Sequence, residues 1–442
     1  MAIQAVRGMK DVFAPEVRKW QFIETAAREV FAAFGFQEIR VPALEKTELF
    51  ARSIGEATDI VEKEMYTFAD RSGESLTLRP EATAGVLRAY IEHKLYASPG
   101  PHKLYTIGPM FRHERPQKGR LRQFHQLDVE VLDDQGPQTD AELMVMLAHL
   151  LGRLGLAKVT LMLNSLGCPD CRPAFREALI AFLAGKREML CDDCRRRLST
   201  NPLRVLDCKS EGCKKAVEGA PKILDHICEG CRDHFRGVQS FLSLANVSFQ
   251  INPWLVRGLD YYVRTTFEAV TGDLGAQNAV AGGGRYDGLV EQLGGPAQGG
   301  IGFGAGLERL ALLIEDKPEW QDGPGLFFAA TGDQPRALAF LMAQKLRQAG
   351  YWTEMTSEDK SLKAQLRKAN KDGARLVVFL GDEELQKDKA QVKSMADGHQ
   401  VEIEMGGLGH FFMNFDQAQA DAGMEDTLWE AFFDSLRPLM RS

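Results

Sequence analysis

The richest chemistry in this chain lies between residues 107 and 130. Six basic side chains fall within eleven residues there, and Glu114 is the single acid among them. They are Arg112, His113, Arg115, Lys118, Arg120 and Arg122. Arginine forks bind phosphoryl oxygens in pairs, and an aromatic ring such as Phe124 can lie against a base. The stretch could therefore bind a polyphosphate, although a solvated charged hairpin on a surface would have the same composition.

Eight cysteines form a second candidate site, and all of them fall within residues 168–231. They make four close pairs: Cys168/Cys171, Cys191/Cys194, Cys208/Cys213 and Cys228/Cys231. Each spacing lets two thiolates reach one tetrahedral ion, so the pairs could supply two zinc sites of four thiolates each. Free buried thiols and a redox dithiol are the alternatives. The spacing does not reveal which pairs combine.

Length and charge limit the classes of protein that fit. A chain of 442 residues is too long for one compact core, so two or three domains are expected. A net charge of −7 argues against wholesale non-specific nucleic-acid binding but allows a local basic surface. The N-terminus has no apolar segment of a secretory signal, and no apolar run is long enough to span a bilayer. We therefore expect a cytoplasmic protein without a membrane partner.

Hydrophobic periodicity predicts the elements that would position the basic stretch. Two antiparallel strands should flank the turn residues Pro116 and Gly119. Residues 75–79 alternate as a strand does, and Glu81 follows close behind the strand end. Such an acid could line a pocket, or it could complement the dipole of the following helix. Residues 139–154 predict another helix, in which Thr139 and Glu142 could form a capping box.

A glycine-rich segment predicts a strand that runs into a helix over residues 299–313. Gly302, Gly304 and Gly306 share one strand face, so a flat ligand or another backbone could approach that face closely. Arg309 follows in the first helical turn. The spacing fits neither the dinucleotide fingerprint nor a Walker A motif.

The last part of the chain predicts a separate small domain. Beyond the linker-like residues 320–325, the order strand–helix–strand–helix–strand implies an α/β domain with a mainly parallel sheet. One of its helices carries a basic stripe of Lys360, Lys363, Arg367 and Lys371. The stripe could be a solvated face or a phosphate-contacting surface for nucleic acid. An acidic tail over 409–442 follows and is expected to be helical.

Five stretches, taken in order, are similar to the motifs of histidyl-tRNA synthetases, a family of class II aminoacyl-tRNA synthetases. They are TLRPEAT (77–83), FRHERPQKGRLRQFHQLDVE (111–130), LVRGLDYY (255–262), GGGRYDGL (282–289) and GIGFGAGLERL (300–310). The resemblance covers roughly residues 1–405 and implies an α+β fold. A class II antiparallel sheet flanked by helices would span residues 1–325, with a cysteine-rich helical insertion at about 165–243. An α/β anticodon-binding domain would span 326–408.

The resemblance also implies a reaction. ATP and L-histidine would give histidyl-adenylate, and the histidyl group would pass to the histidine tRNA. Mg²⁺ would screen the phosphates, and the enzyme would be a homodimer joined around Pro42. The cysteine pairs depart from the family pattern and suggest an insertion stapled by Zn²⁺.

Individual roles follow from the same resemblance. Two cations, Arg112 and Arg257, would be catalytic. The ATP contacts would be Arg112, Glu114, Arg120, Phe124 and Arg309. The histidine contacts would be Glu81, Thr83, Arg112, Gln126, Glu130, Arg257, Tyr261 and Tyr262. Among these, Glu81 and Tyr262 would bind the imidazole ring, and Thr83, Gln126 and Glu130 the α-amino group.

Two other interpretations compete with a synthetase. One is the non-catalytic, synthetase-like regulatory subunit of ATP phosphoribosyltransferase, which typically lacks the histidine-specific residues and the anticodon domain. The other is a nucleic-acid-binding protein with zinc ribbons, which would explain the cysteines but not the five motifs. The synthetase interpretation is favoured because Arg112, Arg257, Tyr261, Tyr262 and Arg309 are all present.

Overall fold

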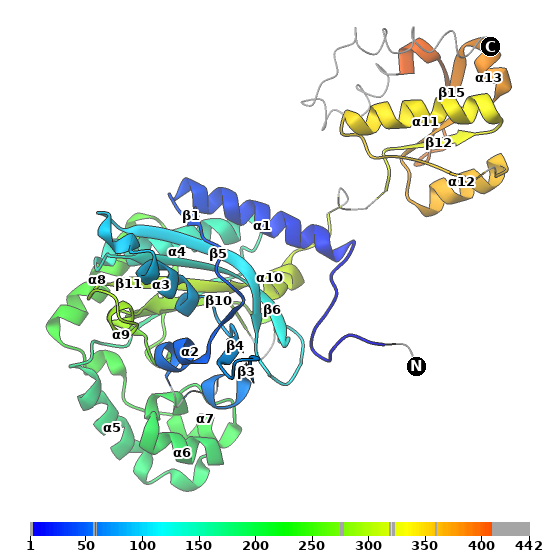
Figure 1. The fold of residues 1–442 in the computed structure, drawn as a ribbon. Helices are drawn as coiled ribbons and strands as arrows, with labels where there is room; N and C mark the ends of the chain where they lie inside the picture. Colours follow the sequence, from blue (N-terminus) through cyan, green and yellow to red (C-terminus); the bar gives the residue numbers. More distant parts are fainter. Residues whose placement is uncertain are drawn as a thin grey trace. The chain divides into compact units, whose positions relative to one another are not determined.

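The chain forms two compact units, Met1–Asp316 and Lys317–Ser442 (Figure 1). The structure is a computed structural model and describes residues 3–55, 58, 60–274, 278–317, 320, 323–358 and 360–408. The division falls at Asp316, whereas the sequence placed the boundary after residue 325. The predicted helical tail over 409–442 lies outside the described residues.

An eight-stranded sheet forms the centre of the first unit, in the order β1-β5-β6-β11-β10-β9-β7-β8. Its strands are β1 (Gln37–Glu38), β5 (His102–Phe111), β6 (Gln123–Leu132), β7 (Thr160–Ser165), β8 (Phe249–Ile251), β9 (Val263–Val270), β10 (Ala279–Arg285) and β11 (Gly300–Gly306). The pairs from β5 through to β7 are antiparallel, and only β1 with β5 and β7 with β8 are parallel. The antiparallel sheet that the resemblance implies is thereby confirmed, with a parallel strand at each edge.

Helices and a small second sheet flank this sheet. Helix α1 (Glu16–Ala33) packs against α4 (Pro137–Arg153) and α10 (Leu307–Leu313), and α10 contacts β6. The α1 sequence dictates this packing, because Trp20, Ile23, Ala27 and Val30 recur at helical spacing and are buried. A three-stranded sheet of β2 (Leu44–Lys46), β4 (Ser75–Leu78) and β3 (Tyr66–Ala69) leads into α3 (Thr83–Glu92), with α2 (Thr47–Ile54) and α9 (Leu289–Gln292) nearby.

The capping box predicted for the fourth helix is wrong. The helix begins at Pro137 after Gly136, two residues before Thr139. The Thr139 hydroxyl donates instead to Asp134 Oδ2 at 2.7 Å, and Glu142 pairs with Lys103 at 2.7 Å. Proline is well suited to the first helical position, since its missing N–H would have no partner there.

The insertion between β7 and β8 is helical, as predicted (Figure 1). Its helices are α5 (Arg172–Ala184), α6 (Asp192–Thr200), α7 (Glu211–Val217) and α8 (Glu229–Leu244). All eight cysteines lie in this segment or at its edges. Its core contains four buried cysteines, packed with leucines such as Leu179 and Leu183 and with Phe175.

The second unit contains a five-stranded sheet in the order β13-β12-β14-β15-β16. The elements are β12 (Leu326–Ala330), α11 (Asp333–Gln348), β13 (Thr353–Met355), α12 (Leu362–Lys371), β14 (Leu376–Leu380), α13 (Asp382–Lys387), β15 (Lys389–Ser394) and β16 (Gln400–Glu404). Strands β12, β13 and β14 pair in parallel, which confirms the predicted α/β arrangement. The antiparallel strands β15 and β16 extend it. The stripe residues Lys360, Lys363, Arg367 and Lys371 are exposed.

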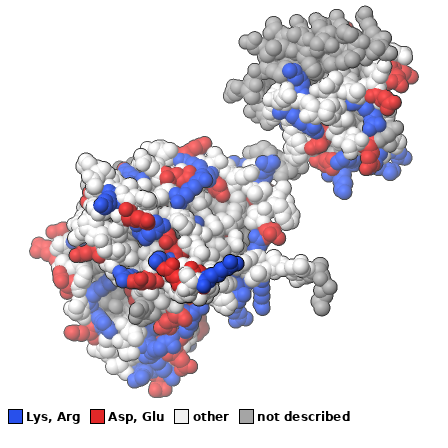
Figure 2. Space-filling model, in the orientation of Figure 1, with Lys and Arg blue, Asp and Glu red and all other residues white. Residues whose placement is uncertain are grey.

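Charge is mixed on one face of the molecule. On the face that Figure 2 shows, Lys and Arg are interspersed with Asp and Glu over the described residues.

None of the described helices combines the length and the apolar composition that crossing a bilayer requires.

A buried ionic network joins the sheet to the helices. Arg285, fully buried at the end of β10, forms an ion pair with Asp140 of α4 and a second one with Asp287 at 3.1 Å. His234 of α8 hydrogen-bonds to the other oxygen of Asp140 at 2.8 Å. Arg285 therefore has a structural task within the GGGRYDGL motif.

Asp140→Ala should destabilise the first unit by about 3–5 kcal/mol, because it leaves the fully buried Arg285 with only the half-buried Asp287 as partner and removes the acceptor of His234. The free energy of unfolding in urea measures the loss. A matched control is Glu29→Ala, which breaks the half-exposed pair with Arg153 and should cost less than about 1 kcal/mol. Equal losses in the two variants would show that the network is not the support we describe.

Candidate active site

One pocket of about 400 Å³ gathers the residues that the sequence motifs single out. All of the residues expected to bind histidine or ATP line it. They are Glu81, Thr83, Arg112, Glu114, Arg120, Phe124, Gln126, Glu130, Arg257, Tyr261, Tyr262 and Arg309. The motifs are spread over residues 77–310, so only the fold of the sheet brings these side chains together. The basic hairpin therefore serves the pocket in part: Arg112 and Arg120 line it, whereas His113, Arg115 and Lys118 are exposed.

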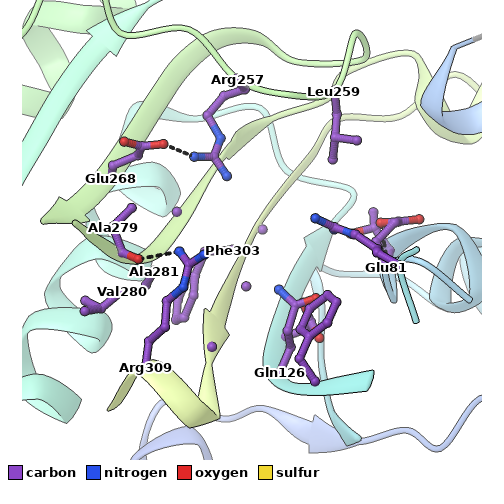
Figure 3. A pocket seen from close by; sticks show the side chains of 18 of the residues that line it. Glu81, Gln126, Arg257, Leu259, Glu268, Ala279, Val280, Ala281, Phe303 and Arg309 are labelled. Carbon is purple, nitrogen blue, oxygen red and sulfur yellow. Dashed lines mark hydrogen bonds and ion pairs between the residues drawn. The ribbon is translucent and has the colours of Figure 1, made fainter. Parts of the chain in front are cut away.

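The cationic wall of the pocket is held by specific partners (Figure 3). Arg257 forms an ion pair with Glu268 of β9. Arg309 donates to the carbonyl oxygens of Ala279 at 2.7 Å and Gly119 at 3.0 Å. In Figure 3 Arg257 and Arg309 lie on one side of the pocket, and Glu81 and Gln126 lie on the other. The two sides thus suit an anionic group and a cationic or polar group respectively.

The hairpin loop organises its own charges. Arg112 Nε donates to the Pro80 carbonyl at 2.8 Å, and its guanidinium lies 5.2 Å from the centre of the Phe124 ring. Arg120 pairs with the buried Glu114 at 2.5 Å. Arg122 donates to the Glu114 carbonyl at 3.2 Å, which gives it a structural task.

Three carboxyl groups are buried on the other side. Glu81 accepts the backbone N–H groups of Thr83 at 3.0 Å and Ala84 at 2.9 Å, so it caps α3 as well as lining the pocket. Burial raises the pKa of Glu81, and it raises the pKa of Asp128 well above its ordinary value. Burial also raises the pKa of Glu130 to about 8.

Glu130 is held by two hydroxyl groups. Thr83 Oγ1 donates to one of its oxygens at 2.6 Å, and Tyr286 donates to the other. The two bonds fix the direction of the carboxyl group without neutralising it. A ligand that carries a positive charge would stabilise the ionised form.

The glycine-alternating strand makes room for these side chains. On β11, Gly302 pairs with Glu130 of β6 and Gly304 pairs with Asp128. A Cβ at Gly302 would lie 1.8 Å from Glu130 Oε2, and one at Gly304 would lie 2.6 Å from Asp128 Oδ1. The predicted bare strand face is confirmed, but the groups that approach it closely are the carboxylates of the neighbouring strand.

Some buried polar atoms of the pocket have no hydrogen-bond partner among the described residues. They are Gln126 Oε1, Asp128 Oδ2 and Arg257 Nε. Unpaired buried polar groups are costly, so their persistence in one pocket is typical of a site that a polar ligand completes.

Several lining residues were not found from the sequence. Three of them, Asp128, Glu268 and Tyr286, lie inside or beside the motifs, but their roles become clear only from their contacts in the pocket. Asp207 and Lys209 come from the cysteine-rich insertion. No sequence signal links the insertion to the pocket, because the contact depends on the tertiary fold.

Comparison with known proteins gives one consistent result. Residues 8–310 match the family described as histidyl-tRNA synthetase, and residues 331–414 match the anticodon binding domain. A histidine–tRNA ligase of Trichlorobacter lovleyi is 56% identical over 405 residues, covering 92% of this chain and 96% of the relative. The corresponding protein of Geobacter sulfurreducens is 54% identical over 403 residues, covering 91% and 97%.

Solved structures agree in fold. An apo histidyl-tRNA synthetase from S. aureus superposes with a TM-score of 0.78 at 35% identity, covering 93% of this chain and all of the other. A Bacillus halodurans protein described as an ATP phosphoribosyltransferase regulatory subunit/histidyl-tRNA synthetase has a TM-score of 0.64 at 19% identity, covering 86% and 99%. At that identity the second likeness concerns the fold alone.

The buried Glu130 should make stability depend on pH. Its pKa is about 8 in the folded chain against 4.5 when unfolded, so the folded chain holds the extra proton between these values. Stability contributed by this group therefore falls as pH rises through that window. Glu130→Gln should resemble the parent chain near pH 5 and exceed its unfolding free energy near pH 8.5 by on the order of a few kcal/mol.

Urea unfolding of the ligand-free protein at both pH values measures this difference. Glu291→Gln is the control, since Glu291 is exposed and lies outside the pocket. A Glu130→Gln effect of the same size at both pH values would contradict the raised pKa.

Proposed function

This chain belongs to the histidyl-tRNA synthetase family, and we infer that its pocket is where L-histidine and ATP react. The chain catalyses the ATP-dependent attachment of L-histidine to its tRNA, as expected from the sequence. One observation carries the placement of the reaction: the pocket joins an arginine-rich wall to a wall of buried carboxyl groups.

The first reaction step brings two anions together. An oxygen of the histidine carboxylate attacks the α-phosphorus of ATP, a new P–O bond forms, and the bond to pyrophosphate breaks. Negative charge grows on the phosphoryl oxygens, so fixed cations aimed at them lower the barrier. In the second step the 3′-terminal hydroxyl of the tRNA attacks the carbonyl carbon, and AMP leaves.

The arginines supply those cations. Arg112 would bridge the carboxylate and the α-phosphate, and Arg257 would act at the same centre. The ion pair with Glu268 supports this, because it fixes the direction of the Arg257 guanidinium before substrate arrives. Arg309, anchored to two carbonyl oxygens, would pack against ATP on the side opposite Phe124.

The hairpin loop would complete the ATP site. Glu114 is buried and paired with Arg120, which places an acceptor and a cation next to each other at the pocket. Glu114 would contact adenine, and Arg120 would contact the γ-phosphate.

Histidine would be recognised by the carboxyl-lined wall. Glu130, Thr83 and Gln126 would hold the α-ammonium group, whose charge satisfies the buried Glu130 carboxylate. Glu81 and Tyr262 would each bind one ring nitrogen, while Tyr261 lines the pocket. A side chain with a single polar partner would leave one of these groups unsatisfied, which is how such a site rejects similar amino acids.

Magnesium would enter with ATP. Among the described residues, two clusters have three or more potential metal ligands close together, and each consists of four cysteines. Neither cluster includes Glu81, Asp128 or Glu130. Mg²⁺ commonly uses phosphate oxygens and water with few protein carboxylates. It would therefore screen the ATP phosphates as a counter-ion.

The remaining partners are also proposals. The exposed basic residues of α12, together with Lys360 just before the helix, offer a phosphate-contacting surface for the tRNA, in a unit that matches the anticodon binding domain. A homodimer would form around the exposed Pro42 region, where Leu44 is also exposed. The reaction requires tRNA and ATP, so we place the protein in the cytoplasm.

Arg257→Ala should leave the fold intact and lower histidine-dependent ATP–pyrophosphate exchange by at least about 100-fold, as expected for loss of one transition-state cation. Arg153→Ala is the matched control, because it also removes an arginine paired with a glutamate, but outside the pocket. Near-normal exchange in Arg257→Ala would remove this residue from the catalytic set. A lack of exchange in the intact parent protein would favour the non-catalytic regulatory subunit instead.

A further inference from the structure

The eight cysteines are sorted into two groups of four. We call Cys168, Cys171, Cys228 and Cys231 the outer tetrad, and Cys191, Cys194, Cys208 and Cys213 the inner tetrad. Within each tetrad all four sulfur atoms lie within 4.8 Å of one another. The inner pairs are thus nested between the outer pairs along the chain.

Sulfur–sulfur distances fit a shared metal ion. The Sγ atoms lie 3.4 Å apart in Cys168/Cys171, 3.9 Å in Cys171/Cys231 and 3.8 Å in Cys191/Cys208. Four sulfurs at about 2.3 Å from a tetrahedral zinc ion would be about 3.8 Å from each other. A disulfide needs a separation of about 2.05 Å, and all eight cysteines are free.

Backbone groups present partial positive charge to several of the sulfur atoms. Cys171, Cys191 and Cys228 stand directly before the first residues of α5, α6 and α8. The positive end of a helix dipole stabilises a thiolate placed there. Backbone N–H groups also point at sulfur: that of Cys228 donates to Cys171 Sγ at 3.0 Å, and that of Cys191 donates to Cys213 Sγ at 3.2 Å.

The inner tetrad adjoins the pocket through the chain neighbours of one of its cysteines. Cys208 lies between Asp207 and Lys209, which both line the pocket that contains Arg257 and Arg309. Asp207 and Lys209 pair with each other at 3.0 Å. The segment that carries them has no strand partner among the described residues, and the nearest regular element before it is the short 3-10 helix Pro202–Val205.

We propose that each tetrad binds one Zn²⁺, and that the inner zinc site holds Asp207 and Lys209 in the wall of the pocket. The helices α6 and α7 on either side have nine and seven residues, too few to be stable in isolation. Four zinc–thiolate bonds would hold these two short helices and the segment between them in place, which their own hydrogen bonds cannot do. The outer zinc site would join the start of α5 to the start of α8 and so close the insertion on itself.

The role that we assign to Lys209 rests on the proposed function. Its ammonium group would contact the polyphosphate of ATP, and the zinc-bound Cys208 next to it would be a positioning residue. A lost charge-assisted contact of this kind corresponds to a rise of about tenfold in KM for ATP.

Metal analysis of the full-length protein, purified without chelator, tests the two sites without any reaction. We expect two zinc ions per chain, one after Cys213→Ser and one after Cys231→Ser. Cobalt substituted for zinc should give the absorption of tetrahedral thiolate coordination. Less than one zinc ion per parent chain would overturn the metal sites, and two ions in either variant would overturn the assignment of cysteines to tetrads.

Exchange kinetics test the link to the pocket. Cys213→Ser and Lys209→Ala should both raise KM for ATP about tenfold, while only Cys213→Ser loses zinc. Cys231→Ser loses the outer zinc and should keep KM for ATP within about twofold. If Cys213→Ser does not fold, Cys213→His retains a zinc ligand and should restore both zinc and KM. An unchanged KM in a folded, one-zinc Cys213→Ser protein, or in Lys209→Ala, would overturn the link.

Discussion

Three carboxyl groups buried beside one another set the main constraint on this molecule. Glu81, Asp128 and Glu130 share one side of a pocket, and burial raises the pKa of each. Such groups cost stability when ionised, and they are relieved only by hydrogen bonds or by a cation. The α-ammonium group of an amino acid meets that need, and the arginines across the pocket meet the opposite need of a polyphosphate. The two substrates would thus neutralise the carboxyl groups and the arginines that face each other in the pocket.

The rest of the fold makes room for the buried carboxyl groups and holds them in place. Glycines on β11 leave space for Glu130 and Asp128, since any side chain at Gly302 would collide with Glu130. Tyr286 follows Arg285 in the chain and donates to Glu130, so the buried Arg285–Asp140 pair also anchors the support of the carboxyl group. A site whose charged groups are fixed in advance needs little rearrangement as the reaction proceeds.

The sequence predicted the elements with strong local signals. The hairpin around Gly119, the glycine strand and the parallel core of the second unit follow from alternation, turn residues and element order. The helix start near Thr139 was misplaced because Asp134 captures its hydroxyl group, a contact that spacing does not reveal. The sorting of cysteines, and the contact of Lys209 with the pocket, depend on distant segments meeting in the fold. The resemblance to the synthetase motifs named the site residues. The contacts that hold those residues in position could be found only in the structure.

The charge state of Glu130 is the most direct point at which to test this account. Calorimetric titration of L-histidine at pH 7, in buffers of different ionisation enthalpy, counts the protons released on binding. With a pKa of about 8, Glu130 should be mostly protonated before binding and ionised after it. The account predicts that the parent protein releases close to one proton more than Glu130→Gln does. Equal proton release in the two proteins would contradict it.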